Sequence, residues 1–327
     1  MPAEWEPHAA TWLTWPRPNG ISFPGRYKTV PPVLSKLVKL ISEGETVHIN
    51  IWDKELELLA IRALDKENVS LKKIHFHPFQ SYEPWCRDHG PMFIVQPNGN
   101  QAIVNWGYNA WGEKYPPFNL DDSIPGKVAA ARKIPLFEPS MILEGGSIEV
   151  NGNDSLITTE QCLLNKNRNP NLNKQEIESR LENFVGVKNI TWLGNGIEGD
   201  DTDGHVDNLT RFVSNDTVVT VVEKNIADPN HLTLQTNRHQ LRQKFNVVEM
   251  PMPRKIEYKG QRLPASYANF YICNSHVIVP TYQDANDDQA VGILSDLFPD
   301  RPVIGLDSLE LIWGLGSFHC LTQQEPA

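Results

Sequence analysis

The segment HVDNLTRFVSNDTVVTVV (205–222) decides the fold. Two runs of apolar and β-branched residues flank the short turn SND, which is the pattern of a β-hairpin. Apolar residues then recur at helical spacing in HLTLQTNRHQLRQKF (231–245), which predicts a helix. The apolar run NVVEMPMP (246–253) predicts one more strand. One structural unit is therefore strand, strand, helix, strand.

The same unit recurs along the chain. Hairpins begin near Pro91, Ser147, Val206 and Phe270, so that successive hairpins are 56, 59 and 64 residues apart. Helices are predicted at 174–186 and 287–298, and a shorter, weaker one at 126–133. A fixed period of this kind is typical of folds that repeat one supersecondary unit.

At this period the 327 residues hold about five units. The fifth unit needs both chain ends: FHCLTQQ (318–324) pairs beside AATWLTWP (9–16), and a helix at 32–44 follows. Such closure hides the edges of the sheets. The helical stretch 54–67 lies outside the repeat. No linker or low-complexity segment interrupts the chain, so we expect a single domain over residues 1–327.

Composition limits the class of protein. The net charge of -10 disfavours nucleic acid as a partner and favours cationic ligands. The first ten residues lack the pattern of a signal peptide, and no apolar stretch is long enough to cross a membrane. We therefore expect a cytoplasmic protein whose four cysteines are free thiols.

Polar residues recur where each first hairpin strand begins. If the units surround a common axis, these residues converge and form a candidate active site. They include a thiol, an imidazole and three carboxylates, and they are Asp88, Glu144, His205, Asp207, Asn269 and Cys320. Taken singly, each can also be an ordinary turn or surface residue. His205 and Asp207 are expected to share one face of a strand, since they are two residues apart.

Two alternatives concern these groups. Cys86 competes with Cys320 as a nucleophile, but an extended segment would place Asp88 on the face of Cys86 and raise the pKa of that thiol. Cys320 follows the glycine-containing WGLGSF, which lets the backbone approach a ligand, and is preferred. His205 and Asp207 also allow a zinc or iron site, although no third ligand has a recognisable spacing.

Several segments together resemble agmatine deiminases, in the peptidylarginine-deiminase-like branch of the guanidino-group-modifying, or pentein, superfamily. The resemblance covers nearly the whole chain, and its segments are MPAEWEPHAATWLTWP, WCRDHGPMFIV, LEGGSIEV, TTEQCLLNKNRNP, GDDTDGHVDNLTRFV, LPASYANFYICN and HCLTQQEP. It implies a five-bladed α/β propeller, in agreement with the count of repeats. It also implies hydrolysis of agmatine to N-carbamoylputrescine and ammonia, a reaction of putrescine and polyamine biosynthesis.

The resemblance implies a role for each site residue. Cys320 is the nucleophile, His205 the general acid and base, and Glu144 a catalytic carboxylate. Asp88 and Asp207 hold the guanidinium nitrogens. The substrate's tail is expected beside Trp85, with Asn269 and Glu198 as further substrate-binding residues. No metal or organic cofactor is implied, the only expected ligand is the small cationic substrate, and family members commonly form homo-oligomers.

The chain departs from the family pattern near the substrate's tail. Leu315 and Ser317 replace parts of a glycine-rich stretch that contains an asparagine, and Glu198 lies where several relatives have an aromatic residue. The ammonium of agmatine needs a carboxylate, and Glu198, Asp201 and Asp203 are candidates. A deiminase of peptidyl-arginine or another guanidino compound, a metal-dependent hydrolase and a non-catalytic scaffold are the alternatives.

Overall fold

The computed structural model describes all residues from Met1 to Ala327 as a mixed α/β fold with five main sheets. Four of the sheets have three strands each. Their strands are β4 (Met92–Val95), β5 (Gln101–Val104) and β6 (Leu136–Phe137); β7 (Ile148–Val150), β8 (Ser155–Thr159) and β9 (Asn189–Leu193); β10 (Thr210–Phe212), β11 (Thr217–Val222) and β12 (Asn246–Pro251); and β15 (Tyr271–Ile272), β16 (Val277–Thr281) and β17 (Val303–Asp307).

Each of these sheets has the predicted order of elements. The first two strands form an antiparallel hairpin, and the third is parallel to the second after a helix. In the third repeat Arg211 pairs with Val219, and Val219 in turn pairs with Val248. The connecting helices are α6 (Ile124–Arg132), α8 (Lys174–Val185), α9 (Asn230–Leu241) and α10 (Asp287–Leu297). The repeat predicted from the sequence is therefore confirmed, although α9 ends four residues earlier than expected.

The two chain ends share the fifth sheet, as predicted. Strand β18 (Thr322–Pro326) is antiparallel to β1 (His8–Thr14), with Thr11 opposite Gln324. Helix α1 (Val30–Gly44) leads to β2 (Thr46–Asn50), which is parallel to β1. Helix α2 (Lys54–Lys66) and strand β3 (Ile74–His77) then add a fourth, parallel strand. The helical stretch 54–67, which lies outside the repeat, thus leads to an extra strand of this sheet.

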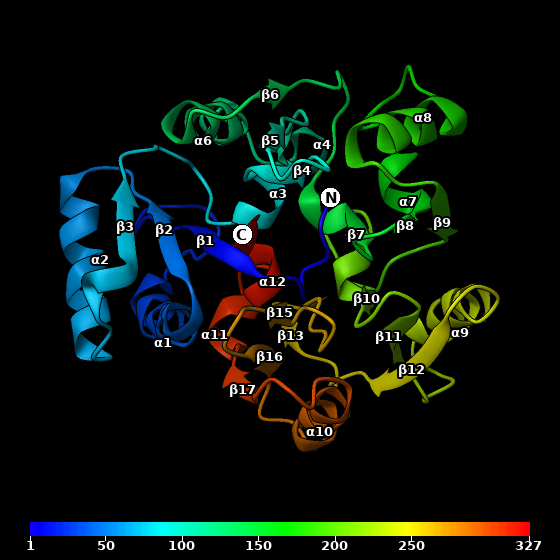
Figure 1. Cartoon of the computed structure of the whole chain (residues 1–327). Helices are drawn as coiled ribbons and strands as arrows, with labels where there is room; N and C mark the ends of the chain where they lie inside the picture. Colours follow the sequence, from blue (N-terminus) through cyan, green and yellow to red (C-terminus); the bar gives the residue numbers. More distant parts are fainter.

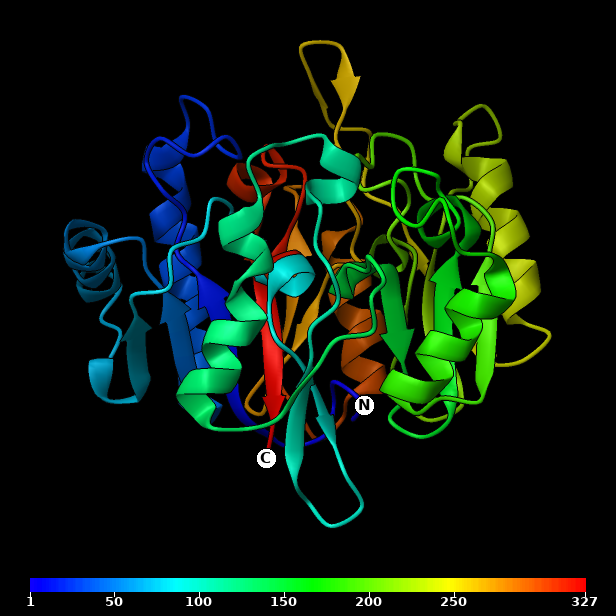
Figure 2. The same cartoon turned by 90° about the horizontal axis from the view of Figure 1, so that it is seen from above.

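The sheets surround the region of α3 (Cys86–His89) and α12 (Phe318–Leu321), and the longer helices lie on the outside (Figure 1). Helix α1 shows why: it buries Leu34, Leu37, Val38 and Ile41 on one face, while its lysines remain exposed. Burial of such an apolar stripe holds a helix against its sheet. Figure 2 shows the hairpin of β13 (Glu257–Tyr258) and β14 (Gln261–Arg262) extending from one end of the molecule, whereas both chain termini lie at the other.

A single helical turn precedes the first strand in four of the five sheets. These turns are α3, η3 (Gly145–Ser147), η4 (Val206–Asn208) and α12. The prediction that His205 and Asp207 lie on a strand, and that Cys320 begins one, is therefore wrong. At His205 the backbone N–H donates to the Asp200 side chain at 3.0 Å instead of to a neighbouring strand, which stabilises the turn.

The remaining elements are short. They are η1 (Tyr27–Thr29), η2 (Leu71–Lys73), α4 (Ala110–Glu113), α5 (Asn119–Asp122), α7 (Glu160–Leu163) and α11 (Leu309–Ile312). None of the helices combines the length and the apolar character that a membrane-crossing segment needs.

Candidate active site

A cavity of about 150 Å³ reaches the predicted nucleophile. Its wall contains aromatic and aliphatic side chains together with three carboxylates. The lining residues are Ile21, Ser22, Pro24, Glu83, Trp85, Asp88, Trp111, Tyr115, Asp201, Thr202, Trp313, Gly314, Leu315, Gly316 and Cys320. They include no lysine and no arginine, so the lining favours a ligand that is cationic and partly apolar.

Asn269 contacts the thiol of Cys320, and both residues were predicted for the site. Cys320 is 5% exposed, and its Sγ accepts a hydrogen bond from Nδ2 of Asn269 at 3.1 Å. The Cys320 backbone N–H donates to Oδ1 of the same asparagine at 3.3 Å. Asn269 thus holds the nucleophile through two hydrogen bonds, and its role as a substrate contact stays a prediction. Burial raises the pKa of the Cys320 thiol well above its usual range, and Asp207 and Asp88 raise it further.

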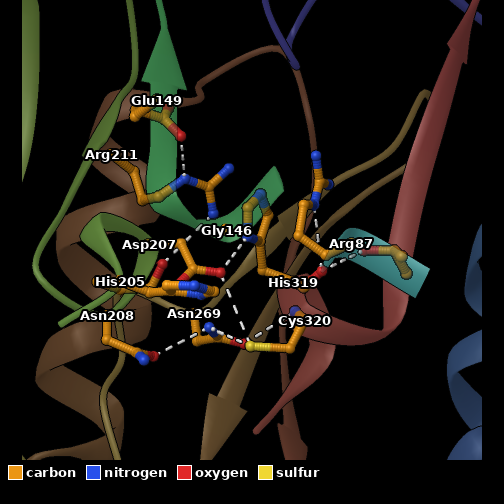
Figure 3. A network of polar contacts seen from close by, with 12 residues as sticks. Arg87, Gly146, Glu149, His205, Asp207, Asn208, Arg211, Asn269, His319 and Cys320 are labelled. Carbon is orange, nitrogen blue, oxygen red and sulfur yellow. Dashed lines mark hydrogen bonds and ion pairs between the residues drawn. The ribbon is translucent and has the colours of Figure 1, made fainter. Parts of the chain in front are cut away.

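Asp207 lies beside the Cys320 thiol and is held by a hydrogen bond from His319. Its Oδ2 is 3.7 Å from Sγ of Cys320 and accepts a hydrogen bond from His319 at 2.7 Å, whereas its Oδ1 has no partner (Figure 3). Burial opposes ionisation, but the hydrogen bond and charge of His319 outweigh it and lower the pKa of Asp207. The free oxygen of an ionised carboxylate is therefore available to a cation.

The second nitrogen of His319 begins a buried ionic network. It lies 2.9 Å from Oε2 of Glu4, which also accepts from Arg87 at 2.9 Å. The other oxygen of Glu4 accepts from Arg211 at 2.8 Å, and Arg211 donates to Glu149. Burial would raise the pKa of Glu4, but the surrounding cations hold it well below its usual range. The N-terminal segment thus supports the site through His319.

Asp88 occupies the other side of the site. Its Oδ2 accepts from Nε1 of Trp111 and its Oδ1 from the backbone N–H of Gly146, both at 3.0 Å. A Cβ at Gly146 would lie 2.6 Å from Nδ1 of His205, 2.9 Å from Asp88 and 3.0 Å from Asp207, so only glycine fits among these groups. Burial raises the pKa of Asp88 to about 6. The predicted carboxylates and imidazole therefore do converge.

The ring of His205 lies between two carboxylates but forms no hydrogen bond. Its Nδ1 is 3.6 Å from Asp88 and its Nε2 is 3.9 Å from Glu144, and neither nitrogen has a partner. Burial opposes the charge on the ring, but Asp88 and its other neighbours raise the pKa of His205 well above the usual range. Glu144 in turn accepts from Arg168 at 2.6 Å. A protonated His205 is thus poised as a general acid.

The metal site considered for His205 and Asp207 does not form as predicted. The ligand atoms of Glu144, Cys162 and His205 lie within 4.8 Å of one another, but Asp207 is not in this group. The guanidinium of Arg168 already neutralises Glu144, which opposes a further cation there.

The glycines before the nucleophile make room for an aromatic wall. A Cβ at Gly316 would lie 2.5 Å from the Trp85 ring, and one at Gly314 would lie 2.9 Å from it. Trp85 is fixed by a hydrogen bond from its Nε1 to Ser22 at 2.9 Å. Leu315, one of the departures from the family pattern, lines the cavity, whereas Ser317 is buried and bonds to Ser308. The predicted position of Trp85 beside a ligand is consistent with this lining.

Among the acidic residues predicted for the substrate's tail, only Asp201 lines the cavity. Glu198 is exposed, its N–H donates to Asn230 and it does not line the cavity, so its prediction as a substrate contact is not supported. Asp203 is bound to Lys114, Asn167 and Arg168.

Sequence reasoning missed Glu4, Glu83, Arg168 and His319. Their only signal was a position within or beside the motifs.

Known proteins resemble this chain along its whole length. The family model for Porphyromonas-type peptidyl-arginine deiminase matches residues 1–326. Agmatine deiminase from Pseudomonas fluorescens is 37% identical and is aligned over 100% of this chain and 95% of its own length. A solved cysteine-to-serine variant of C. jejuni agmatine deiminase with substrate bound has a TM-score of 0.92 at 32% identity, covering 100% of this chain and 96% of that one. Agmatine deiminase of Enterococcus faecalis gives 0.91 at 30%, covering 100% and 95%. This chain belongs to the Porphyromonas-type peptidyl-arginine deiminase family.

Proposed function

We propose that the protein is an agmatine deiminase, which hydrolyses the guanidinium of agmatine to N-carbamoylputrescine and ammonia. The observation that carries the proposal is the cavity in which Cys320 and Asp88 lie together, with Oδ2 of Asp207 3.7 Å from Sγ of Cys320. The relatives of similar length that bear this name support the choice of substrate. The product of this hydrolysis, N-carbamoylputrescine, is then an intermediate in putrescine biosynthesis.

The two aspartates hold the guanidinium. A planar guanidinium offers N–H donors in a fork, and carboxylates on either side accept them in charge-assisted hydrogen bonds. Asp207 presents an oxygen that has no partner, and Asp88 is fixed by Trp111 and Gly146. The substrate's methylene groups then lie along the wall that Trp85 provides.

Binding of the guanidinium cation favours ionisation of the Cys320 thiol. Asp207 and Asp88 both raise the pKa of Cys320, so neutralising them lowers the cost of the thiolate. The thiol proton passes to water, and the sulfur attacks the guanidinium carbon. His205 protonates one nitrogen of the tetrahedral adduct, and ammonia departs. Water then attacks the amidino-cysteine with His205 as the base, and the ureido product leaves with the thiol restored.

We also propose that the five sheets close into a five-bladed α/β propeller and that residues 1–327 form one domain. The repeated hairpin, helix and parallel strand support the first point, and the pairing of β18 with β1 supports both. A cytoplasmic location fits the four unpaired cysteines.

The direct test is turnover of a panel of guanidino compounds. Purified protein is expected to release one ammonia per agmatine, while free arginine and a peptidyl-arginine react far more slowly, since the cavity lining offers three carboxylates and no cationic side chain. Mass spectrometry of acid-quenched protein should show an amidino adduct on Cys320. Faster turnover of the peptide than of agmatine would favour the alternative deiminase.

His319 provides a test of how Asp207 is positioned. An asparagine amide can replace the Nδ1 contact to Asp207, whereas a glutamine amide reaches toward the Nε2 contact to Glu4. We expect His319→Gln to lower kcat/KM by about 100-fold and His319→Asn by about 10-fold, the range seen when supporting residues are lost. Equal losses in both variants would show that His319 stabilises the fold and does not orient Asp207.

A further inference from the structure

One acidic residue in the cavity, Glu83, lacks a cationic partner. Glu83 precedes Trp85 by two residues and is 4% exposed. Glu83 lines the same cavity as Asp88 and Cys320. Oε2 accepts a hydrogen bond from the Ser22 hydroxyl, whereas Oε1 is buried without any partner. A buried carboxylate oxygen of this kind is costly unless a ligand completes its hydrogen bonding.

The backbone around Glu83 is firmly held. Its N–H donates to Oδ1 of Asp121 at 3.0 Å, and its carbonyl accepts from His89 and from Ser81, each at 3.0 Å. Ser22 fixes the carboxylate and also accepts from Trp85. Glu83 is therefore held in place at the cavity wall, which lowers the entropic cost of binding a ligand there.

The competing carboxylates already have partners. Asp201 is 39% exposed at its side chain, accepts from the Tyr115 hydroxyl at 2.5 Å and lies 3.6 Å from Nζ of Lys114. Asp203 forms salt bridges with Lys114 and Arg168 and does not line the cavity. Solvent and these cations weaken the attraction of either residue for another cation.

The electrostatics of Glu83 agree with its geometry. Burial raises the pKa of Glu83 to about 7, the hydrogen bond from Ser22 lowers it, and the charge of Asp121 raises it. Arg17, which forms no salt bridge with it, and the backbone of Ile21 exert smaller opposing effects. A cation bound at the free oxygen would remove most of this destabilisation.

We propose that Glu83 is the residue that recognises the distal ammonium of the substrate, with its free oxygen accepting an ammonium N–H. This inference rests on the proposed function and assigns the second charged end of the substrate. Asp88 and Glu83 then bind the two cationic ends, and Trp85, which lies between them in sequence and lines the same cavity, borders the four methylene groups. A substrate with a neutral tail gains nothing from Glu83.

The test compares agmatine with pentylguanidine, in which a methyl group replaces the ammonium. Glu83→Gln keeps the shape and the acceptor for Ser22 but removes the charge. We expect kcat/KM for agmatine to fall by about 10- to 100-fold, mainly through KM, as for loss of one charge-assisted hydrogen bond. Activity on pentylguanidine should change by less than about threefold, because its tail makes no such contact.

Two further variants make the result specific. Asp201→Asn is the matched control at the other lining carboxylate, and its effect on agmatine should be clearly smaller. Glu83→Asp keeps the charge and should retain more agmatine activity than Glu83→Gln. Equal losses on both substrates, or a selective loss only in Asp201→Asn, would overturn the assignment. Wild-type protein that uses pentylguanidine but not agmatine would instead refute the proposed function.

Discussion

Replacement of Cys320 by alanine is expected to lower kcat for agmatine by at least about 10⁴-fold, because Cys320 is the cysteine that lines the cavity and forms the covalent adduct. Asp88 and Asp207 remain in the variant, so agmatine should still bind. Calorimetric titration is expected to show binding while ammonia release is lost. The mass spectrum of the quenched variant should show no adduct.

Cys86→Ala is the matched control. Cys86 is completely buried among Trp12, Phe93 and Ile103, and burial raises the pKa of its thiol to about 12. Its loss should cost about 1 kcal/mol of stability and leave kcat within about twofold. A Cys320→Ala protein that retains most of its activity would eliminate the covalent mechanism, whatever the control shows.

The repeat was predictable because hairpins leave a strong local signal. Each hairpin joins two β-type runs through a short turn, and the helix after it has its own apolar period. The pairing of 318–324 with 9–16 followed from counting units, since four complete units left one strand at the end of the chain and another at its start. Repetition thus converted local patterns into a prediction about distant contacts.

The helical turns that carry the site were not predictable in the same way. Turns such as Val206–Asn208 contain too few residues to show a period, and the residues after His205 read as a strand. Their geometry depends on side chains from elsewhere, as when Asp200 accepts the N–H of His205. Convergence of the polar residues was still predicted correctly, because it depended on their place in each repeat and not on their local conformation.

The supporting residues required the three-dimensional structure. Glu4 contacts Arg87, Arg211 and His319 across most of the chain length, and nothing in its local sequence marks it as buried. Glu198 illustrates the opposite case. Its place beside the motif suggested a substrate contact, but Glu198 is exposed to solvent and does not line the cavity. Sequence position identifies which segments meet, whereas the direction of each side chain is set by packing.

Asp88→Asn is expected to lower kcat/KM by about 10² to 10³-fold, because an amide cannot neutralise the guanidinium and turns a donor toward its N–H groups. The same contact holds the substrate and polarises its carbon, so KM should rise and kcat should fall together. Asparagine has one acceptor oxygen where Asp88 uses two, so either Gly146 or Trp111 loses its acceptor and the thermal unfolding midpoint should decrease by a few degrees, which is measured alongside the kinetics. Normal kinetics in this variant would contradict the clamp.

The pH dependence gives a second readout of the same residue. Asp88 must be ionised to hold the guanidinium, and burial raises the pKa of Asp88 to about 6. Below that pH the free enzyme carries a neutral carboxyl group, so kcat/KM should decrease as the pH falls through about 6. Pentylguanidine is the suitable substrate, since its neutral tail does not report the ionisation of Glu83. In Asp88→Asn this decrease of kcat/KM at low pH should disappear. If the decrease persists unchanged, another group causes it.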